Sequence, residues 1–110
     1  MTLTPSQLAS IARGLGYDSI ELIDGLYICA KSEPIETCDQ PSLPELAASC
    51  KRALREAGMH VSITFYANGC RVEIWKRNDM YSTELRHFDD ADDDAAVCLS
   101  FAAYIQGKAK

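Results

Sequence analysis

The chain has 110 residues, of which 47% are hydrophobic, 25% charged and 8% aromatic. This length fits one domain, and the hydrophobic fraction argues against a chain that is disordered throughout. The formal net charge of −5 argues against a general nucleic-acid-binding protein, because neutralising phosphates requires surplus lysine and arginine.

The first third of the chain predicts a helix and a hairpin. Thr4-Pro5 is typical of a helix start, and Gly14-Leu15-Gly16 is typical of its end. Two β-prone runs follow, at 20–23 and 26–30. The Asp24-Gly25 pair between them favours a type I′ turn, in which both central residues need positive φ.

A loop and a second helix come next. Residues 32–41 contain two prolines and no hydrophobic period, which predicts a loop. Ser42 and Glu45 then have the spacing of a capping box, with Pro44 in the first turn, and Gly58 is expected to end the helix. A buried stripe at helical spacing is predicted along it, consisting of Leu43, Leu46, Ala47, Cys50, Leu54 and Ala57.

Three further strands are predicted as a meander. Asn68-Gly69 indicates a two-residue hairpin turn between 61–67 and 70–77, and 80–87 is expected to add the third strand. The turn predicts a register in which the buried face carries three pairs: Ala67 with Cys70, Phe65 with Val72, and Ile63 with Ile74.

An acidic run precedes the last predicted helix, 95–105, which Gly107 is expected to end. The helix is apolar nearly all round, which favours a place in the centre of the core; the alternative is a spare face used by a second subunit in a homodimer. The acidic run consists of Asp89, Asp90, Asp92, Asp93 and Asp94.

These elements predict an α+β domain of order α-β-β-α-β-β-β-α, in which an antiparallel sheet packs with helices in a layered sandwich. We expect one domain over 1–110. It would consist of a helix and hairpin at 1–31, the loop at 32–41 and an α-β-β-β-α unit at 42–107.

The five cysteines favour reduced, mostly buried thiols in a cytoplasmic protein. No two of them form a CxxC pair, which argues against a zinc ribbon or a thioredoxin-type site. Cys38, in the polar loop, is the best candidate for an exposed thiol. Residues 1–5 lack the features of a signal peptide, and no apolar stretch is long enough to cross a membrane.

The α-β-β-β-α order from Ser42 to Gln106 is shared with the double-stranded-RNA-binding domain. In that domain the second helix opens with a lysine-rich cluster that contacts phosphates, whereas this chain has the aspartates at the matching place. The inverted charge means that RNA binding does not carry over.

A second resemblance covers about two-thirds of the chain. The chain resembles small phage and prophage proteins that carry the ABA-sandwich domain, in the segments Leu46-Ala47-Ala48, Val72-Glu73-Ile74-Trp75 and Asp94-Ala95-Ala96-Val97-Cys98-Leu99-Ser100-Phe101-Ala102. The resemblance implies an origin in a phage or mobile element, no catalytic residues, and a second layer that covers the sheet. Small acidic proteins from such elements include anti-CRISPR inhibitors, several of which occlude nucleic-acid-binding surfaces.

The acidic run has two main interpretations. One is a cap for the last helix in a solvated turn, which needs only one or two of the acids. The other is a patch that mimics DNA and docks on lysines and arginines of a partner. A calcium loop is the weakest alternative: Asp90, Asp92 and Asp94 alternate, but the required glycine and distal glutamate are missing.

The outer face of the meander is the second candidate surface. It carries Tyr66, Arg71, Trp75 and Arg77, residue types that are enriched at binding hot spots. The alternative is that the N-terminal hairpin or a third layer buries this face.

His60 and His87 have no neighbours at the spacing of metal ligands, and no nucleophile, base and orienting group converge, so no metal, cofactor or enzymatic activity is expected. We therefore expect a non-enzymatic acidic protein that inhibits a host nucleic-acid-targeting defence complex, such as a CRISPR effector. It would occupy a basic surface, without binding nucleic acid or membrane itself. The alternative is a non-enzymatic structural or regulatory phage protein, for which a homodimer is one option.

Overall fold

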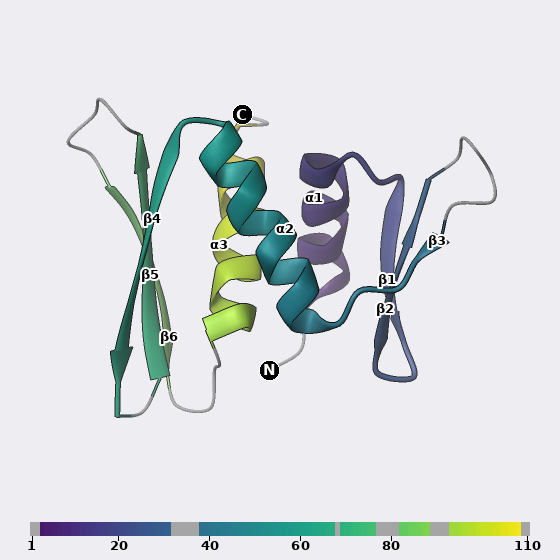
Figure 1. Ribbon diagram of the computed structural model, residues 1–110, viewed down its shortest axis with the longest axis horizontal. Coiled ribbons are helices and arrows are strands. Elements are labelled where there is room, and N and C mark those ends of the chain that lie inside the picture. Colours follow the sequence, from purple (N-terminus) through teal and green to yellow (C-terminus); the bar gives the residue numbers. More distant parts are fainter. Residues whose placement is uncertain (1–2, 32–37, 68, 77–81, 89–92, 109–110) are drawn as a thin grey trace.

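The computed structural model describes residues 3–31, 38–67, 69–76, 82–88 and 93–108 (Figure 1), apart from the side chains of 38, 75, 76, 82–88 and 108. These residues form three helices and six strands. In chain order they are α1 (Pro5–Leu15), β1 (Ser19–Ile23), β2 (Leu26–Ala30), β3 (Cys38–Asp39), α2 (Leu43–Glu56), β4 (Met59–Tyr66), β5 (Gly69–Lys76), β6 (Ser82–Phe88) and α3 (Asp93–Lys108). The α+β class is confirmed, and the order is the predicted one with the short strand β3 added.

The two ends of α1 follow the predicted signals. The backbone N–H of Gln7 donates to Thr4 Oγ1 at 3.2 Å, and the N–H of Thr4 donates to Gln7 Oε1 at 2.8 Å, which completes a capping box. At the other end Gly16 has φ +83°, and its N–H donates to the carbonyl of Ala12. A left-handed residue in this position satisfies a helix-end carbonyl at no steric cost only if it is glycine.

The first hairpin has the predicted turn. Asp24 and Gly25 have φ +51° and +82°, and Ile23 pairs with Leu26 on either side of them. Strand β3 pairs with β2, with Cys38 opposite Ala30. The predicted loop therefore contains a short strand, while its residues 32–37 lie outside the described part.

Helix α2 begins and ends close to the predicted residues. The N–H of Glu45 donates to Ser42 Oγ at 3.4 Å, and Ser42 Oγ donates to Glu45 Oε1 at 3.0 Å. Gly58, with φ +81°, follows the last turn as expected. The buried stripe is confirmed for Leu46, Ala47, Cys50 and Leu54, whereas Leu43 is half-buried and Ala57 exposed.

The register predicted for the second hairpin is wrong. Tyr66 pairs with Gly69, so the connection consists of residues 67 and 68, and Phe65 faces Cys70 instead of Val72. Ile63 likewise faces Val72. Each partner is displaced by two positions, and because side chains alternate with period two, every residue keeps its predicted face. Burial therefore does not distinguish the two registers, and only the position of the turn does.

The strands divide into two three-stranded sheets, β1-β2-β3 and β4-β5-β6. Figure 1 shows the helices between them, with α2 and α3 beside the second sheet and α1 beside the first. Helix α3 contacts α1, α2, β5 and β6, and its residues from Ala95 to Ala102 are buried. The prediction that this helix lies in the centre of the core is confirmed, and its contacts use several sides of the helix.

The prediction that Gly107 ends the last helix is wrong, because α3 continues to Lys108. The last turn is held by packing and by a hydrogen bond. Tyr104 and Ile105 are partly buried against the core, and Gln106 Nε2 donates to Ser10 Oγ of α1 at 3.1 Å. These contacts offset the weak helix propensity of glycine.

Candidate functional site

The acidic run lies only partly within the described residues. Asp93 and Asp94 form the first turn of α3 and are half-buried, while Asp89, Asp90 and Asp92 lie outside the described part. Carboxylates in the first turn interact favourably with the positive end of the helix dipole. The capping interpretation is therefore consistent with the two described aspartates.

The strand pairing places Tyr66 at the same end of the sheet as Phe88, the residue that precedes this run in the sequence. Strand β6 ends at Phe88, the residue before Asp89. Phe88 pairs with Gly69, and Gly69 pairs with Tyr66 on its other side. Phe88, which directly precedes the acidic run in the sequence, is thus two strands away from Tyr66 at the turn end of the second sheet.

Two aromatic side chains are exposed at this turn end. Tyr66 is 56% exposed and Phe65 is 67% exposed. Phe65 was predicted on the buried face, and it does share that face with Cys70, Val72 and Ile74. Those three lie on the central strand β5, whereas β4 is at the edge of the sheet, where less of the helical layer covers it. The predicted meander makes 70–77 its middle strand, but it does not show that β4 lacks a further partner strand and full cover by the helices.

The other residues predicted on the outer face do not gather at the turn end. Arg71 and Glu73 are half-buried, and Arg71 Nη1 lies 3.6 Å from Glu73 Oε1. Trp75 pairs with His60 at the opposite end of the strands, and its side chain, like all of Arg77, lies outside the described part. Of this set, Tyr66 pairs next to the turn itself, and Arg71 pairs with Thr64, two positions farther along.

The expectation that the N-terminal hairpin covers the outer face is wrong. Strands β1 and β2 lie on the far side of the helices from the second sheet (Figure 1). The physical reason is that the inner face of the hairpin, with Ile20 and Cys29 buried, packs on the helical layer instead.

The four cysteines with described side chains are buried free thiols, as predicted. They are Cys29, Cys50, Cys70 and Cys98; the side chain of Cys38 lies outside the described part. A hydrogen bond with Cys98 and burial raise the pKa of Cys50 well above its usual range. A thiol that stays protonated is a poor nucleophile, so Cys50 acts as a core residue.

Metal ligands do not cluster in the described part of the chain. No group of three or more histidine, cysteine, aspartate or glutamate residues there lies close enough to hold an ion. His60 is exposed on β4, and the side chain of His87 is not among those described. None of the helices among the described residues is long and apolar enough to cross a membrane.

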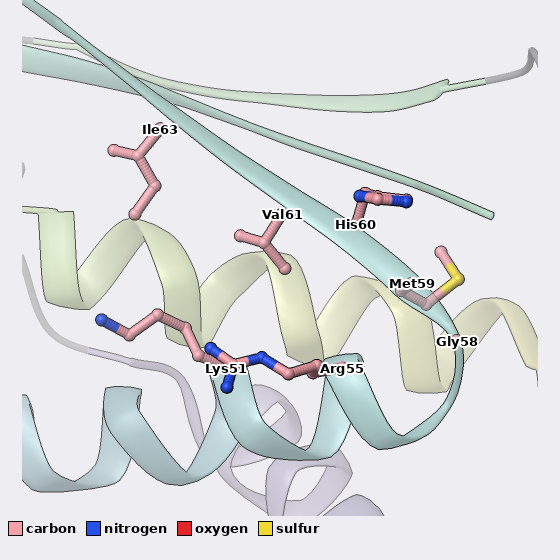
Figure 2. Close-up of a pocket in the computed structure, with 7 residues that line it drawn as sticks. All are labelled: Lys51, Arg55, Gly58, Met59, His60, Val61 and Ile63. Atoms are coloured by element: carbon pink, nitrogen blue, oxygen red, sulfur yellow. The ribbon is translucent and has the colours of Figure 1, made fainter. Parts of the chain in front are cut away.

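A groove that the sequence did not indicate lies between α2 and the first half of β4. Its volume is about 500 Å³, and Figure 2 shows the residues around it: Lys51, Arg55, Gly58, Met59, His60, Val61 and Ile63. Lys51 and Arg55 extend along α2 on one side, and Val61 and Ile63 point from β4 on the other. Both cations lie outside the buried stripe predicted for this helix, which is where solvated side chains are expected. The sequence does not show that an edge strand lies opposite them.

Comparison of the chain with protein-family profiles, with curated proteins and with solved structures gave no match.

Proposed function

We propose that this chain is a non-enzymatic binding protein, encoded by a phage or mobile element, that inhibits a nucleic-acid-targeting defence complex in the host cytoplasm. The acidic run at 89–94 and the exposed aromatic rings of Phe65 and Tyr66 would together contact a basic surface of that complex. Such a surface normally holds DNA or RNA, as in a CRISPR effector. The proposal gives the chain the role of a competitor with nucleic acid.

The observation that carries this proposal is the common location of the two features. Tyr66 and Phe88, the residue that precedes the acidic run in the sequence, both pair with Gly69 at one end of the second sheet. Exposed aromatic side chains supply apolar contact area, and clustered carboxylates attract lysine and arginine over a distance. Either feature alone has an ordinary structural explanation, but together they resemble the anchor and rim of a protein interface.

The direct test measures competition. Purified CRISPR effector complexes are mixed with fluorescently labelled target DNA, and DNA binding is followed by anisotropy as the chain is added. We expect DNA binding to fall. Replacing Asp90, Asp92, Asp93 and Asp94 with serine should lower the association rate with the effector by about tenfold at low salt, and should make binding less salt-sensitive.

A matched pair of variants separates a local patch from total charge. Asp93→Asn with Asp94→Asn removes two charges at the patch, and Glu21→Gln with Glu56→Gln removes two from exposed positions on β1 and α2. Only the first pair should slow association. If both pairs slow it equally, or if no effector loses DNA, the proposal is wrong. Self-association measured by sedimentation, without any effect on DNA binding, would instead favour the homodimeric structural protein.

A further inference from the structure

Strand β4 is an edge strand without the usual protection. The sheet order β4-β5-β6 leaves one side of β4 without a partner strand among the described residues. Its sequence, Met-His-Val-Ser-Ile-Thr-Phe-Tyr, contains no lysine, arginine, aspartate, glutamate, proline or glycine. Natural proteins commonly place such residues on exposed edges, because unpaired backbone groups there accept another strand. An eight-residue edge rich in β-branched and aromatic residues is therefore suited to receive one.

The side chains of β4 that point toward the helices are incompletely covered. Val61 and Ile63 are half-buried, whereas Val72 and Ile74, which face them from β5, are 0% and 1% exposed. The uncovered parts of Val61 and Ile63 line the groove beside α2 (Figure 2). The inward-facing side chains of a strand added to β4 could thus pack their aliphatic parts against Val61 and Ile63.

The wall of the groove is positively charged. Lys51 and Arg55 stand four residues apart on α2, so they are neighbours on the helix surface, and like charges at this spacing destabilise a helix slightly. The residues that line the groove include no carboxylate, and neither cation forms an ion pair with a described residue. In a chain of net charge −5, this hollow is suited to an anionic occupant.

We propose that the edge of β4 accepts an extended acidic segment of a partner protein as an added strand. Backbone hydrogen bonds to β4 would provide register, and carboxylates on the inward face of the segment would meet Lys51 and Arg55. This is the binding mode known as β-augmentation, in which the sheet edge supplies affinity and the flanking side chains supply specificity. The groove shares no charged residue with the acidic run, although the end of β4, at Phe65 and Tyr66, also belongs to the surface of the proposed function.

Charge favours an acidic partner over a second copy of this chain. Pairing two β4 edges would bring two α2 helices to the same side of the joined sheet. The Lys51 and Arg55 side chains of both copies would then approach one another, and like charges brought together at an interface oppose association. An acidic strand replaces that repulsion with attraction.

The experiment uses a defined probe, an eight-residue synthetic peptide that alternates glutamate with threonine and has blocked ends. Binding to the whole chain is measured by calorimetry at low salt. Lys51→Glu with Arg55→Glu should weaken binding by about tenfold or more, as expected for the reversal of two contacting charges. The matched control, Arg13→Glu with Lys31→Glu, makes the same change in net charge at exposed positions outside the groove and should alter binding by less than about twofold.

A second probe tests the backbone hydrogen bonds. The same peptide, N-methylated at alternate residues, keeps its charge but loses the donors along one edge, and it should bind at least about tenfold more weakly. Hydrogen exchange at the β4 amides should slow only with the unmodified peptide. Four outcomes would overturn the inference: no binding of the unmodified peptide, equal binding of the methylated one, equal weakening in the control variant, or tighter binding of a single-stranded oligonucleotide. A dimer joined through β4 would overturn it as well. None of these results bears on the acidic run, whose residues are unchanged in every variant.

Discussion

The two sheets of this protein lie on opposite sides of the same helices and are buried to very different degrees. In the second sheet the inner face of the central strand is closed, with Cys70, Val72 and Ile74 at most 2% exposed. In the first sheet the buried side chains are those of Ile20, Tyr27 and Cys29, on the face toward the helices. Leu22, on the same face, is 39% exposed, and Ile23 and Leu26, which pair with each other on the opposite face, are both 48% exposed.

The difference shows that burial follows the helix that covers a strand and not the hydrophobicity of the strand itself. Helix α3 packs along β5 and β6 and is itself surrounded by α1 and α2. The first sheet has β1 against α1, and its turn extends past that contact. A buried apolar side chain of β5 is therefore expected to contribute more packing free energy than an exposed apolar side chain of the first sheet.

The largest expected effect comes from truncating one isoleucine in each sheet. Ile74→Ala removes a side chain that is 1% exposed, and should lower the free energy of unfolding by about 2–5 kcal/mol. Ile23→Ala makes the same chemical change at a side chain that is 48% exposed, and should cost less than about 1 kcal/mol. Urea denaturation of both variants gives the comparison directly. Equal losses would show that burial of the side chain does not decide its contribution to stability.

A smaller effect is expected where α1 meets α3, the contact that links the two halves. A Cβ added at Gly14 would lie 2.5 Å from Phe101 Cζ and 2.7 Å from Ile105 Cδ1. Gly14→Ala should therefore force both side chains to move and destabilise the protein by about 1–3 kcal/mol. Gly107→Ala is the control, because nothing lies within 4 Å of its added Cβ and the residue is helical. It should stabilise the protein by up to about 1 kcal/mol, and thermal melts of the two variants should shift in opposite directions.

The smallest effect concerns the attachment of the first sheet, and it depends on pH. The Tyr17 hydroxyl donates to Asp39 Oδ2 at 2.8 Å, which ties the end of α1 to β3. Burial, this hydrogen bond and the negative charge of Asp39 raise the pKa of Tyr17 from 10.0 to about 12. Because the folded state holds this proton more tightly than the unfolded state, the stabilisation is complete below the ordinary pKa and is lost as the pH rises toward 12.

Tyr17→Phe removes the titrating group and should flatten this part of the pH dependence. The measurement is the difference in unfolding free energy between the natural chain and the variant, followed across the alkaline range in which tyrosine titrates. The difference should shrink as the pH rises, since the other tyrosines and the cysteines titrate in both proteins. A difference that stays constant would mean that Tyr17 titrates alike in the folded and unfolded chains.

Local signals predicted the element ends well because they act within a few residues. Thr4, Ser42 and Gly58 satisfy backbone groups of their own helix, and Asp24-Gly25 adopts the positive φ of its own turn. Such local interactions can be predicted from the sequence without knowing which distant segments pack nearby. Prediction from local signals was wrong at Asn68-Gly69, where two registers two residues apart bury the same faces. It was also wrong at Gly107, where packing of the last turn outweighed the weak helix propensity of glycine.

The candidate surfaces were less predictable. Tyr66 and the acidic run were each singled out from the sequence, but only strand pairing shows that Tyr66 and Phe88, the residue before the run, share one end of a sheet. Phe65 was placed on the correct face, yet its 67% exposure depends on β4 being an edge strand. The sequence gives Lys51 and Arg55 the pattern of ordinary solvated charges, and only the tertiary structure shows that they line a groove opposite β4.

The sequence by itself determined the α+β class, the helix and turn boundaries, the faces of the strands and the burial of the described thiols. Each of these depends on periodicity or on contacts within a few residues. Only the tertiary structure decided that the strands form two sheets with helices between them, which strand lies at an edge, and where the groove opens. Those properties depend on which distant segments pack together. A hydrophobic face in the sequence predicts that the face will be buried, but it does not identify the element that buries it.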